Sequence, residues 1–288
     1  MAFNWQTFRT RALTAIIFVF VMAVGLLWSK WSFFILFSIV HFGCWIEYQK
    51  LVGIFNPDYK TINAFHRYGV MMAGWFLMLF FTHAELQLGG IRLNEVAWWL
   101  GILFLFLFPL VQLITARNFF IKNIGYSFCG LLYISLSLAL LIDMRNRWSA
   151  ESYNTLGLTV PLLIIFTIWI NDTMAYIVGS MIGKTPLSPI SPKKTWEGTI
   201  GGALLAVLVM SLLAYSTGRL PVVHTAVVAA LAAIAGTFGD LFESKLKRMA
   251  GVKDSGNIMP GHGGFLDRFD SLLFAATAAW FYAVTFIS

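Results

Sequence analysis

Residues 156–182 read LGLTVPLLIIFTIWINDTMAYIVGSMI. An α-helix needs about 20 mostly apolar residues to cross the roughly 30 Å hydrocarbon core of a bilayer, and this stretch is long enough. Asn171 and Asp172 interrupt it. An ionisable group inside a membrane costs on the order of 3 kcal/mol unless it is paired or wetted. Asp172 is therefore a candidate functional residue.

Similar apolar runs recur along the whole chain. Of its 288 residues, 59% are hydrophobic and 11% are charged, against about 25% charged residues in a soluble domain. The runs are rich in Phe and Leu and do not alternate in polarity as barrel strands do. We therefore expect an all-α polytopic integral membrane protein with about nine transmembrane helices. The expected spans are 12–28, 31–52, 68–84, 96–116, 122–142, 156–182, 196–215, 222–242 and 266–287.

The basic residues predict the orientation of these spans, because cytoplasmic loops of membrane proteins carry an excess of Lys and Arg. The chain has 20 Lys and Arg residues and a net charge of +7. With a cytoplasmic N-terminus, the opposite side receives only Lys30, Arg92, Arg145, Arg147 and Arg219. We expect a multi-pass protein of the cell inner membrane, with its C-terminus opposite the cytoplasm. The positive face suits anionic lipids and phosphorylated solutes.

The two halves of the chain differ in their polar residues. We expect one membrane domain, 1–288, in which 1–150 forms scaffold helices and 151–288 forms the catalytic half. In the first half, Glu47 lies near the end of its span and close to Lys50, so an interfacial ion pair explains it at least as well as chemistry does. Cys44 and Cys129 fall inside apolar spans and indicate neither a disulfide nor a metal cluster.

The first polar cluster of the second half covers residues 171–198. Ala175, Gly179 and Gly183 follow Asp172 at four-residue spacing, so one helical face is open to a neighbouring helix or a substrate, with packing the simpler explanation. The segment SPKKTWEG follows at 191–198. Two lysines beside a helix N-terminus form a good phosphate site, although ordinary cytoplasmic lysines would look the same. The polar members of this segment are Ser191, Lys193, Lys194 and Glu197.

The second cluster covers residues 239–271. On a helix, Asp240, Glu243, Ser244 and Lys247 share one face, and the same spacing places Asp267 and Asp270 together on the next helix. Two oxygen-rich faces that flank a glycine-rich loop fit a hard divalent cation such as Mg²⁺. His262 is as consistent with a structural role as with a phosphate contact. This inventory is typical of phosphoryl or nucleotidyl transfer, which relies on positioning and on charge neutralisation.

The sequence resembles the phosphatidate cytidylyltransferase, or CDP-diacylglycerol synthase, family. The residues that carry the resemblance are Ser244, Leu246, Lys247, Arg248, Lys253, Asp254, Gly256, Pro260, His262, Gly263, Gly264, Phe265, Asp267, Arg268 and Asp270. The likeness continues through Asp172, Ala175 and Tyr176 and through SPKKTWEG, and more loosely through Trp45 and Glu47. Met259 replaces the usual Leu, Ile or Phe, and Thr173 stands where many members have Ser.

The resemblance implies the reaction and the roles of residues. CTP and phosphatidic acid would give CDP-diacylglycerol and pyrophosphate with Mg²⁺, a second metal or a monovalent cation being left open. The implied metal ligands are Asp240 and Asp267, then Asp270 and Ser244. The implied phosphate-binding cations are Lys193, Lys194, Lys247, Arg248 and Lys253, while Asp172 would complete the metal site or hold one of these cations. The other implied substrate-binding residues are Ser191, Glu197, Asp254, His262, Gly263, Gly264 and Arg268.

Three other functions fit less well. A transporter of an anionic solute would use intramembrane Asp172, but the charges gather at one edge. An alcohol phosphotransferase would show a ladder of aspartates at four-residue intervals, which the sequence lacks. The full set of carboxylates argues against a regulatory pseudoenzyme. The expected partners are CTP, phosphatidic acid and membrane lipids, without nucleic acid, and a homodimer is left open.

Overall fold

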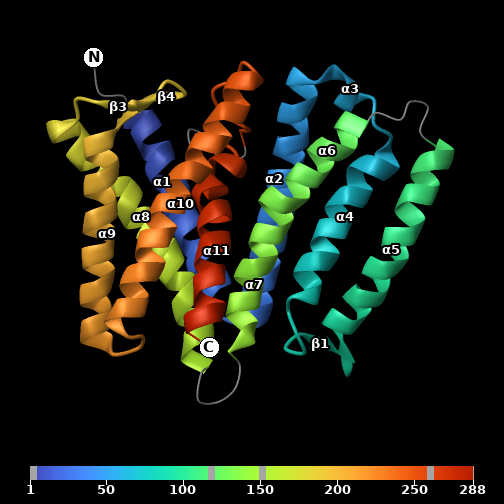
Figure 1. The fold of residues 1–288 in the computed structure, drawn as a ribbon, viewed down its shortest axis with the longest axis horizontal. Helices are drawn as coiled ribbons and strands as arrows, with labels where there is room; N and C mark the ends of the chain where they lie inside the picture. Colours follow the sequence, from blue (N-terminus) through green and yellow to red (C-terminus); the bar gives the residue numbers. More distant parts are fainter. Residues whose placement is uncertain (1–4, 116–120, 149–153, 258–262, 288) are drawn as a thin grey trace. The chain divides into compact units, whose positions relative to one another are not determined.

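The computed structural model describes the backbone of residues 5–115, 121–148, 154–257 and 263–287; the side chains of 5–12, 115, 154 and 155 are not described. The described chain is almost entirely helical, as expected, and each of the nine expected ranges overlaps a helix (Figure 1). Its contacts divide it into two compact units. Met1–Ser135 and Met249–Phe269 form the first unit, and Leu136–Arg248 and Asp270–Ser288 form the second.

The first unit contains most of the N-terminal helices. They are α1 (Trp5–Leu27), α2 (Lys30–Phe55), α3 (Pro57–Lys60), α4 (Ala64–Phe80), α5 (Leu93–Thr115), α6 (Ile121–Gly130) and most of the π-helical turn η1 (Leu131–Leu136), with a two-stranded hairpin of β1 (Gln87–Leu88) and β2 (Ile91–Arg92). Ser29 starts α2 with a reciprocal capping box, and Asn63 caps α4. Trp45 and Phe37 of α2 are fully buried. Helix α2 is therefore part of the core of this unit.

The second unit contains the helices that carry Asp172, Asp240 and Asp270. They are α7 (Ser137–Arg147), α8 (Asn154–Ile182), α9 (Trp196–Thr217), α10 (Val222–Met249) and most of α11 (Leu266–Phe286). Between α8 and α9 the chain forms an antiparallel hairpin of β3 (Pro186–Ser188) and β4 (Ser191–Thr195), where the sequence indicated only a loop. Helix α9 begins at its N-cap Thr195 and ends at Gly218, whose φ of 62° favours glycine.

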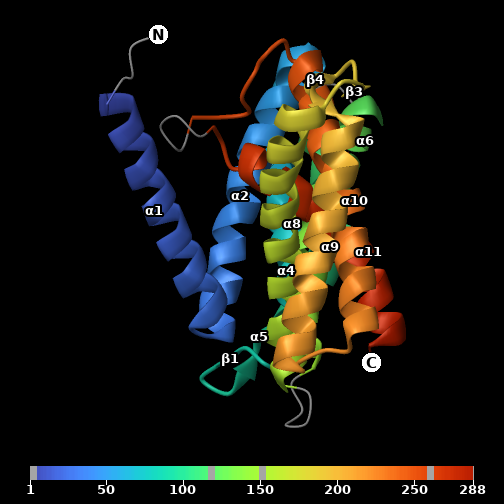
Figure 2. The same ribbon diagram turned by 90° about the vertical axis from the view of Figure 1, so that its left-hand side faces the viewer.

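Helices α8 and α9 run side by side (Figure 2). A Cβ at Gly198 would lie 2.7 Å from the carbonyl oxygen of Ala175, and a Cβ at Gly183 would lie 2.6 Å from the Thr195 hydroxyl. The small-residue face of α8 therefore packs against the start of α9, which confirms the packing interpretation of its glycines. This contact places the β3–β4 hairpin at the end of the two helices.

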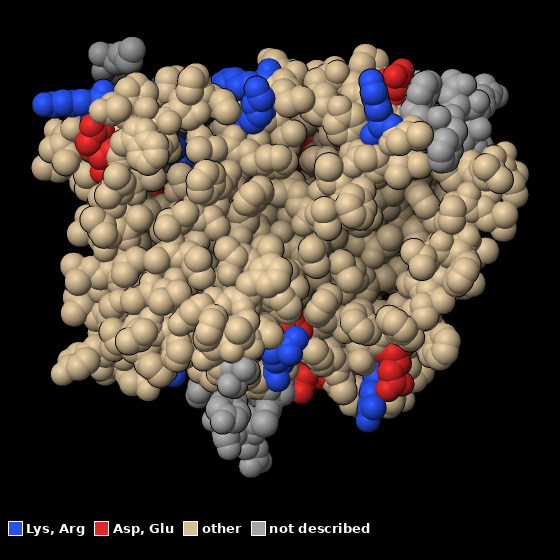
Figure 3. Space-filling model, viewed as in Figure 1, with Lys and Arg blue, Asp and Glu red and all other residues tan. Residues whose placement is uncertain are grey.

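The helices have the dimensions and the polarity of membrane spans. In the described part of the chain, seven helical stretches are long and apolar enough to cross a membrane: Lys30–Phe55, Leu93–Ile114, Ile121–Arg147, Leu156–Ile182, Trp196–Thr217, Val222–Met249 and Leu266–Phe286. Helix α4, with 17 residues, and the apolar stretch Leu13–Leu27 are shorter. Charged side chains gather near the helix ends, and uncharged residues cover the stretch between them (Figure 3). The chain is an integral membrane protein.

Candidate metal centre

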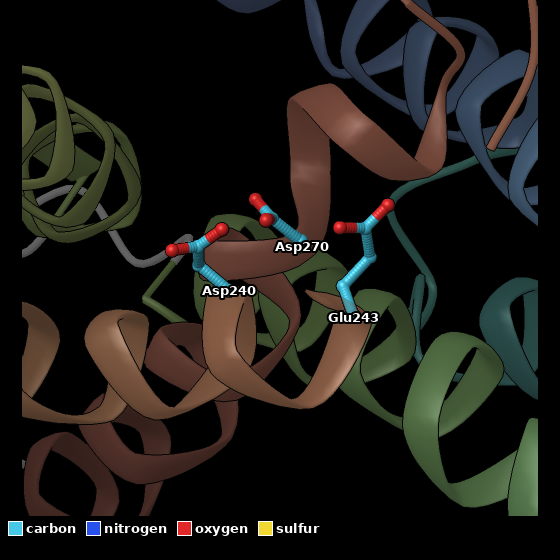
Figure 4. Close-up of side chains that lie close together, drawn as sticks. All are labelled: Asp240, Glu243 and Asp270. Atoms are coloured by element: carbon cyan, nitrogen blue, oxygen red, sulfur yellow. The ribbon is translucent and has the colours of Figure 1, made fainter. Parts of the chain in front are cut away.

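Three carboxylates meet in the second unit. Asp240 and Glu243 lie one turn apart on α10, and Asp270 lies on α11. One oxygen of each lies within 4.8 Å of the others, and Figure 4 shows the three side chains gathered around a common space. Asp270 is 8% exposed, and the Glu243 side chain is fully buried. Carboxylates this close repel one another unless a cation or a proton offsets part of their charge.

Close contact between α10 and α11 brings the carboxylates together. A Cβ at Gly239 would lie 2.4 Å from the carbonyl oxygen of Asp270, and one at Gly236 would lie 3.4 Å from the Cβ of Ser271. The two glycines are three residues apart and share one face of α10. Asp240 follows Gly239 directly, so this close approach of the backbones also places its carboxylate beside that of Asp270.

Two lysines compensate part of the negative charge. Lys194 of β4 forms an ion pair with Asp240, and Lys247 forms one with Glu243 one turn away on α10. Burial lowers the pKa of the Lys194 ammonium below its ordinary value, while the carboxylates of Asp172 and Asp270 act in the opposite direction. Lys194 therefore interacts with carboxylates from three helices, α8, α10 and α11.

The hairpin positions Lys194 and separates it from its neighbour. Lys193 is exposed, whereas Lys194 is half-buried, since successive residues of a strand face opposite sides. The carboxylate of Glu197 accepts hydrogen bonds from the Thr185 hydroxyl at 2.9 Å and from the backbone N–H groups of Lys184 and Thr185 at 3.2 Å. Glu197 was predicted to bind substrate. This role stays a prediction; in the structure the carboxylate ties the start of the hairpin to the first turn of α9.

The charge of this cluster suits a divalent cation. Asp172, whose carboxylate accepts a hydrogen bond from the Asn171 side chain, acts electrostatically on Lys194 together with Asp270. With all four carboxylates of Asp172, Asp240, Glu243 and Asp270 ionised, their formal charge exceeds that of the ammonium groups of Lys194 and Lys247 by two. Carboxylate oxygens are the ligands that Mg²⁺ prefers. The donor set therefore fits a hard divalent ion.

The predicted metal ligands are distributed over both units. Asp240 and Asp270 meet as the spacing indicated, and Glu243 joins them. The half-buried Ser244 stays a predicted ligand. Asp267 belongs to the first unit. There its Oδ2 accepts hydrogen bonds from the backbone N–H of Ser255 at 2.9 Å and of Gly264 at 2.8 Å. Its role as a metal ligand stays a prediction.

The remaining predicted residues lie in β4, at the end of α10, or in residues 249–269 of the first unit. Gly263 has a φ of 85°, a backbone conformation that favours glycine, and a Cβ there would lie 2.6 Å from Asp267 Oδ2. His262 lies outside the described residues. The exposed members of the predicted set are Asp172, Lys193, Arg248, Lys253, Asp254 and Arg268, and Ser191 is half-buried in β4.

Two buried carboxylates, those of Glu243 and Glu47, are missing from the site residues that the sequence predicts. Glu243 was placed on the face of Asp240, but it was not chosen as a ligand. Glu47 was explained by Lys50, whereas in the structure it accepts hydrogen bonds from Ser255, Phe265 and Leu266. The signal for Glu243 was its three-residue spacing from Asp240, and the signal for Glu47 was its position within an apolar span.

A model of the cytidylyltransferase family matches residues 9–286 of the chain. The chain belongs to the cytidylyltransferase family. This confirms the family and the enzyme class that the sequence motifs indicated, a nucleotidyltransferase. The match covers both units, so the family includes the scaffold helices as well as the acidic ones.

Curated relatives of this cytidylyltransferase have names that specify a substrate. It is 33% identical to a phosphatidate cytidylyltransferase of Bacillus subtilis over 98% of each chain. It is 31% identical to a phosphatidate cytidylyltransferase of Thermotoga maritima, over 82% of this chain and 88% of the relative. A chloroplastic phosphatidate cytidylyltransferase 4 of Arabidopsis thaliana is 38% identical over 54% of this chain and 40% of the relative.

Proposed function

We propose that this cytidylyltransferase transfers CMP from CTP to phosphatidate and forms CDP-diacylglycerol and pyrophosphate. The observation that carries the proposal is the cluster of Asp240, Glu243 and Asp270 with its two paired lysines, in a membrane-spanning chain of this family. The relative that matches both chains almost end to end has the corresponding name. Phospholipid biosynthesis is the process that uses this reaction.

The reaction brings two anions together. A phosphate oxygen of phosphatidate forms a bond to the α-phosphorus of CTP, and the bond from this phosphorus to the bridging oxygen of the β-phosphate breaks, which releases pyrophosphate. Repulsion between lipid phosphate and triphosphate must be offset by positive charge. Lys194 and Lys247, held at the cluster by their carboxylate partners, supply part of it. Among the residues that the sequence assigns to phosphate or substrate binding, Lys193, Arg248, Lys253 and Arg268 are exposed cations.

Asp240, Glu243 and Asp270 would hold Mg²⁺, and the ion would neutralise charge on the phosphate oxygens and orient them. Asp267 and Ser244 stay in the proposed ligand set from the sequence. Because four carboxylates outnumber two lysines in formal charge, the cluster is compatible with a second metal or a monovalent cation. Burial lowers the pKa of Lys194, and the Asp172 carboxylate opposes this effect because it favours the protonated ammonium group.

The proposed topology has nine membrane crossings, with α1 and α4 crossing in addition to the seven longer spans. The N-terminus would lie in the cytoplasm and the C-terminus on the other side of the inner membrane. The excess of Lys and Arg in the alternate loops supports this orientation. The metal centre would then face cytosolic CTP while the acyl chains of phosphatidate stay in the bilayer. A homodimer stays a prediction, which the mass of the purified protein in detergent tests.

CTP labelled at either the α- or the γ-phosphate tests the reaction. Purified protein in detergent is incubated with phosphatidic acid, Mg²⁺ and one of the two labelled nucleotides. We expect the α-label in a lipid that migrates as CDP-diacylglycerol and the γ-label in pyrophosphate. A γ-label in the lipid would indicate a kinase, and no transfer of either label by folded protein would exclude the proposed reaction.

A further inference from the structure

The carboxylate of Glu47 on α2 is buried, at 7% exposure, and the segment around residue 265 occupies both of its oxygens. Oε1 accepts a hydrogen bond from the backbone N–H of Phe265 at 2.9 Å, and Oε2 accepts one from the backbone N–H of Leu266 at 2.8 Å. The hydroxyl of Ser255 lies 2.7 Å from Oε2. Helix α2 therefore holds a segment that is more than 200 residues away in sequence.

The segment held by Glu47 contains Asp267. The Ser255 hydroxyl lies 2.8 Å from Asp267 Oδ2 as well as 2.7 Å from Glu47 Oε2, so a single side chain connects the two carboxylates. Asp267 Oδ2 also accepts from the backbone N–H of Ser255 and of Gly264. All these residues belong to the first unit. The position of the Asp267 carboxylate thus depends on Ser255, and that of Ser255 depends on Glu47.

Two glycines make room for the Glu47 carboxylate. A Cβ at Gly256 would lie 2.2 Å from Glu47 Oε1, and a Cβ at Gly264 would lie 2.3 Å from both carboxylate oxygens. Neither glycine has a positive φ, so space and not backbone conformation requires glycine here. One turn before Glu47 on α2, Gly43 receives the Phe265 ring, with which its Cβ would collide at 2.1 Å. One face of α2 is therefore shaped to fit the segment.

The start of α11 needs such a partner. The first backbone N–H groups of a helix have no acceptor within the helix, and a side chain just before the helix usually caps them. In this chain an acceptor from α2 takes the N–H groups of Phe265, which directly precedes α11, and of Leu266, its first residue. A change at Glu47 would therefore shift or loosen the first turn of α11, including Asp267.

We infer that Glu47 is a positioning residue for the reaction: it holds the start of α11, and with it Asp267, in the geometry that the transfer requires. This inference rests on the proposed function for the part that concerns activity. The contacts themselves predict a local effect on the backbone that can be measured without turnover.

Glu47→Gln tests the inference. Glutamine keeps the size of the side chain but replaces one acceptor oxygen by an NH₂ group, which faces donors. We expect kcat at least tenfold lower, the KM for CTP within about twofold of the wild type, and faster hydrogen exchange at Phe265 and Leu266. The matched control is Gln49→Met on the same helix. Gln49 is equally buried, at 8% exposure, and donates one hydrogen bond to the carbonyl of Arg67. The Gln49→Met variant should have a lower thermal stability without a change in kcat or in hydrogen exchange at residues 265 and 266.

A double variant separates positioning from general damage. Gly264→Ala should lower kcat strongly, because its Cβ meets the Glu47 carboxylate. In a Glu47→Ala background that obstacle is gone, so the additional loss from Gly264→Ala should be less than about twofold. Fully additive losses would contradict the inference, because the two residues would then act independently.

The outcomes distinguish the inference from the proposed function. If the wild type forms no CDP-diacylglycerol, the proposed function fails, and exchange at Phe265 and Leu266 still decides whether Glu47 holds the segment. If the wild type is active and Glu47→Gln keeps the wild-type kcat, Glu47 does not position the site. Unchanged exchange at both amides in Glu47→Gln would also overturn the inference.

Discussion

Gly239 of α10 lies directly against the backbone of Asp270 of α11, with room for a hydrogen atom and no more: a Cβ would lie 2.4 Å from the Asp270 carbonyl oxygen. This contact links helix packing to chemistry, because the two helices that meet here carry Asp240, Glu243 and Asp270. The separation of the helices therefore determines the separation of the carboxylates.

Gly239→Ala should separate the helices and spread the carboxylates. Overpacking of this kind costs about 1–3 kcal/mol, and we expect activity to fall at least tenfold because Asp270 moves away from Asp240. Thermal unfolding in detergent and initial rates provide the two readouts. Gly101→Ala on α5 is the control, since a Cβ at Gly101 meets nothing within 4 Å. Equal activity in the two variants would show that the contact does not set the geometry of the site.

Asp270→Asn should stabilise the protein in the absence of metal and weaken its stabilisation by Mg²⁺. Without metal, the buried Asp270 carboxylate is repelled by Asp240 and Glu243, so its neutralisation should raise the melting temperature measured in EDTA. Mg²⁺ should stabilise the wild type more than the variant, because an ion that binds only the folded state shifts unfolding. If Mg²⁺ raises the melting temperature of both proteins equally, Asp270 is not a ligand.

Lys194→Met and Lys193→Met should differ although the lysines are neighbours. Lys194 forms an ion pair with Asp240 and is half-buried, whereas Lys193 is exposed. Removal of Lys194 leaves the cluster with additional negative charge that repels the phosphates, so we expect at least a hundredfold loss of kcat/KM for CTP. For Lys193→Met we expect a loss of less than tenfold. Steady-state kinetics at constant ionic strength measure both, and the reverse order would contradict the assignment.

Glu197→Gln should affect the site through the hairpin. The Glu197 carboxylate accepts three hydrogen bonds from Lys184 and Thr185, and their loss should loosen the strand that carries Lys194. Partial loss of these hydrogen bonds at an exposed carboxylate should raise the KM for CTP severalfold with little change in melting temperature. An unchanged KM would show that the hydrogen bonds of Glu197 do not position Lys194.

The sequence predicted the helical membrane architecture well, because long apolar runs are a local pattern. It also predicted that Asp240 and Asp270 meet, since both lie on polar faces beside the glycine-rich segment. It did not predict that Glu243 joins the cluster of Asp240 and Asp270. Spacing on one helix shows which residues share a face, but the facing helix decides which of them converge. Gly239 controls that convergence, and its effect depends on a backbone 31 positions away in sequence.

The partners of Glu47 were beyond sequence reasoning for a related reason. Lys50 is close in sequence and supplies an obvious counter-charge, so a local ion pair was the natural interpretation. The actual partners are donors around residues 255 and 265, which tertiary packing alone brings to α2. The β3–β4 hairpin was likewise read as a loop, because five residues that include Pro192 and two lysines have no strand pattern.

The most direct test of the proposed metal centre is the rate at which the α-label of CTP enters lipid. This rate is measured as the Mg²⁺ concentration is raised from zero, in the wild type and in Asp270→Asn. The exposed Asp58→Asn of α3 is the control for loss of one charge. If Asp270 is a ligand of the proposed metal centre, we expect no transfer in EDTA and saturable transfer for the wild type and Asp58→Asn. For Asp270→Asn we expect a maximal rate at least a hundredfold lower. Transfer by Asp270→Asn at the wild-type rate and with the same Mg²⁺ dependence would contradict the proposed metal centre.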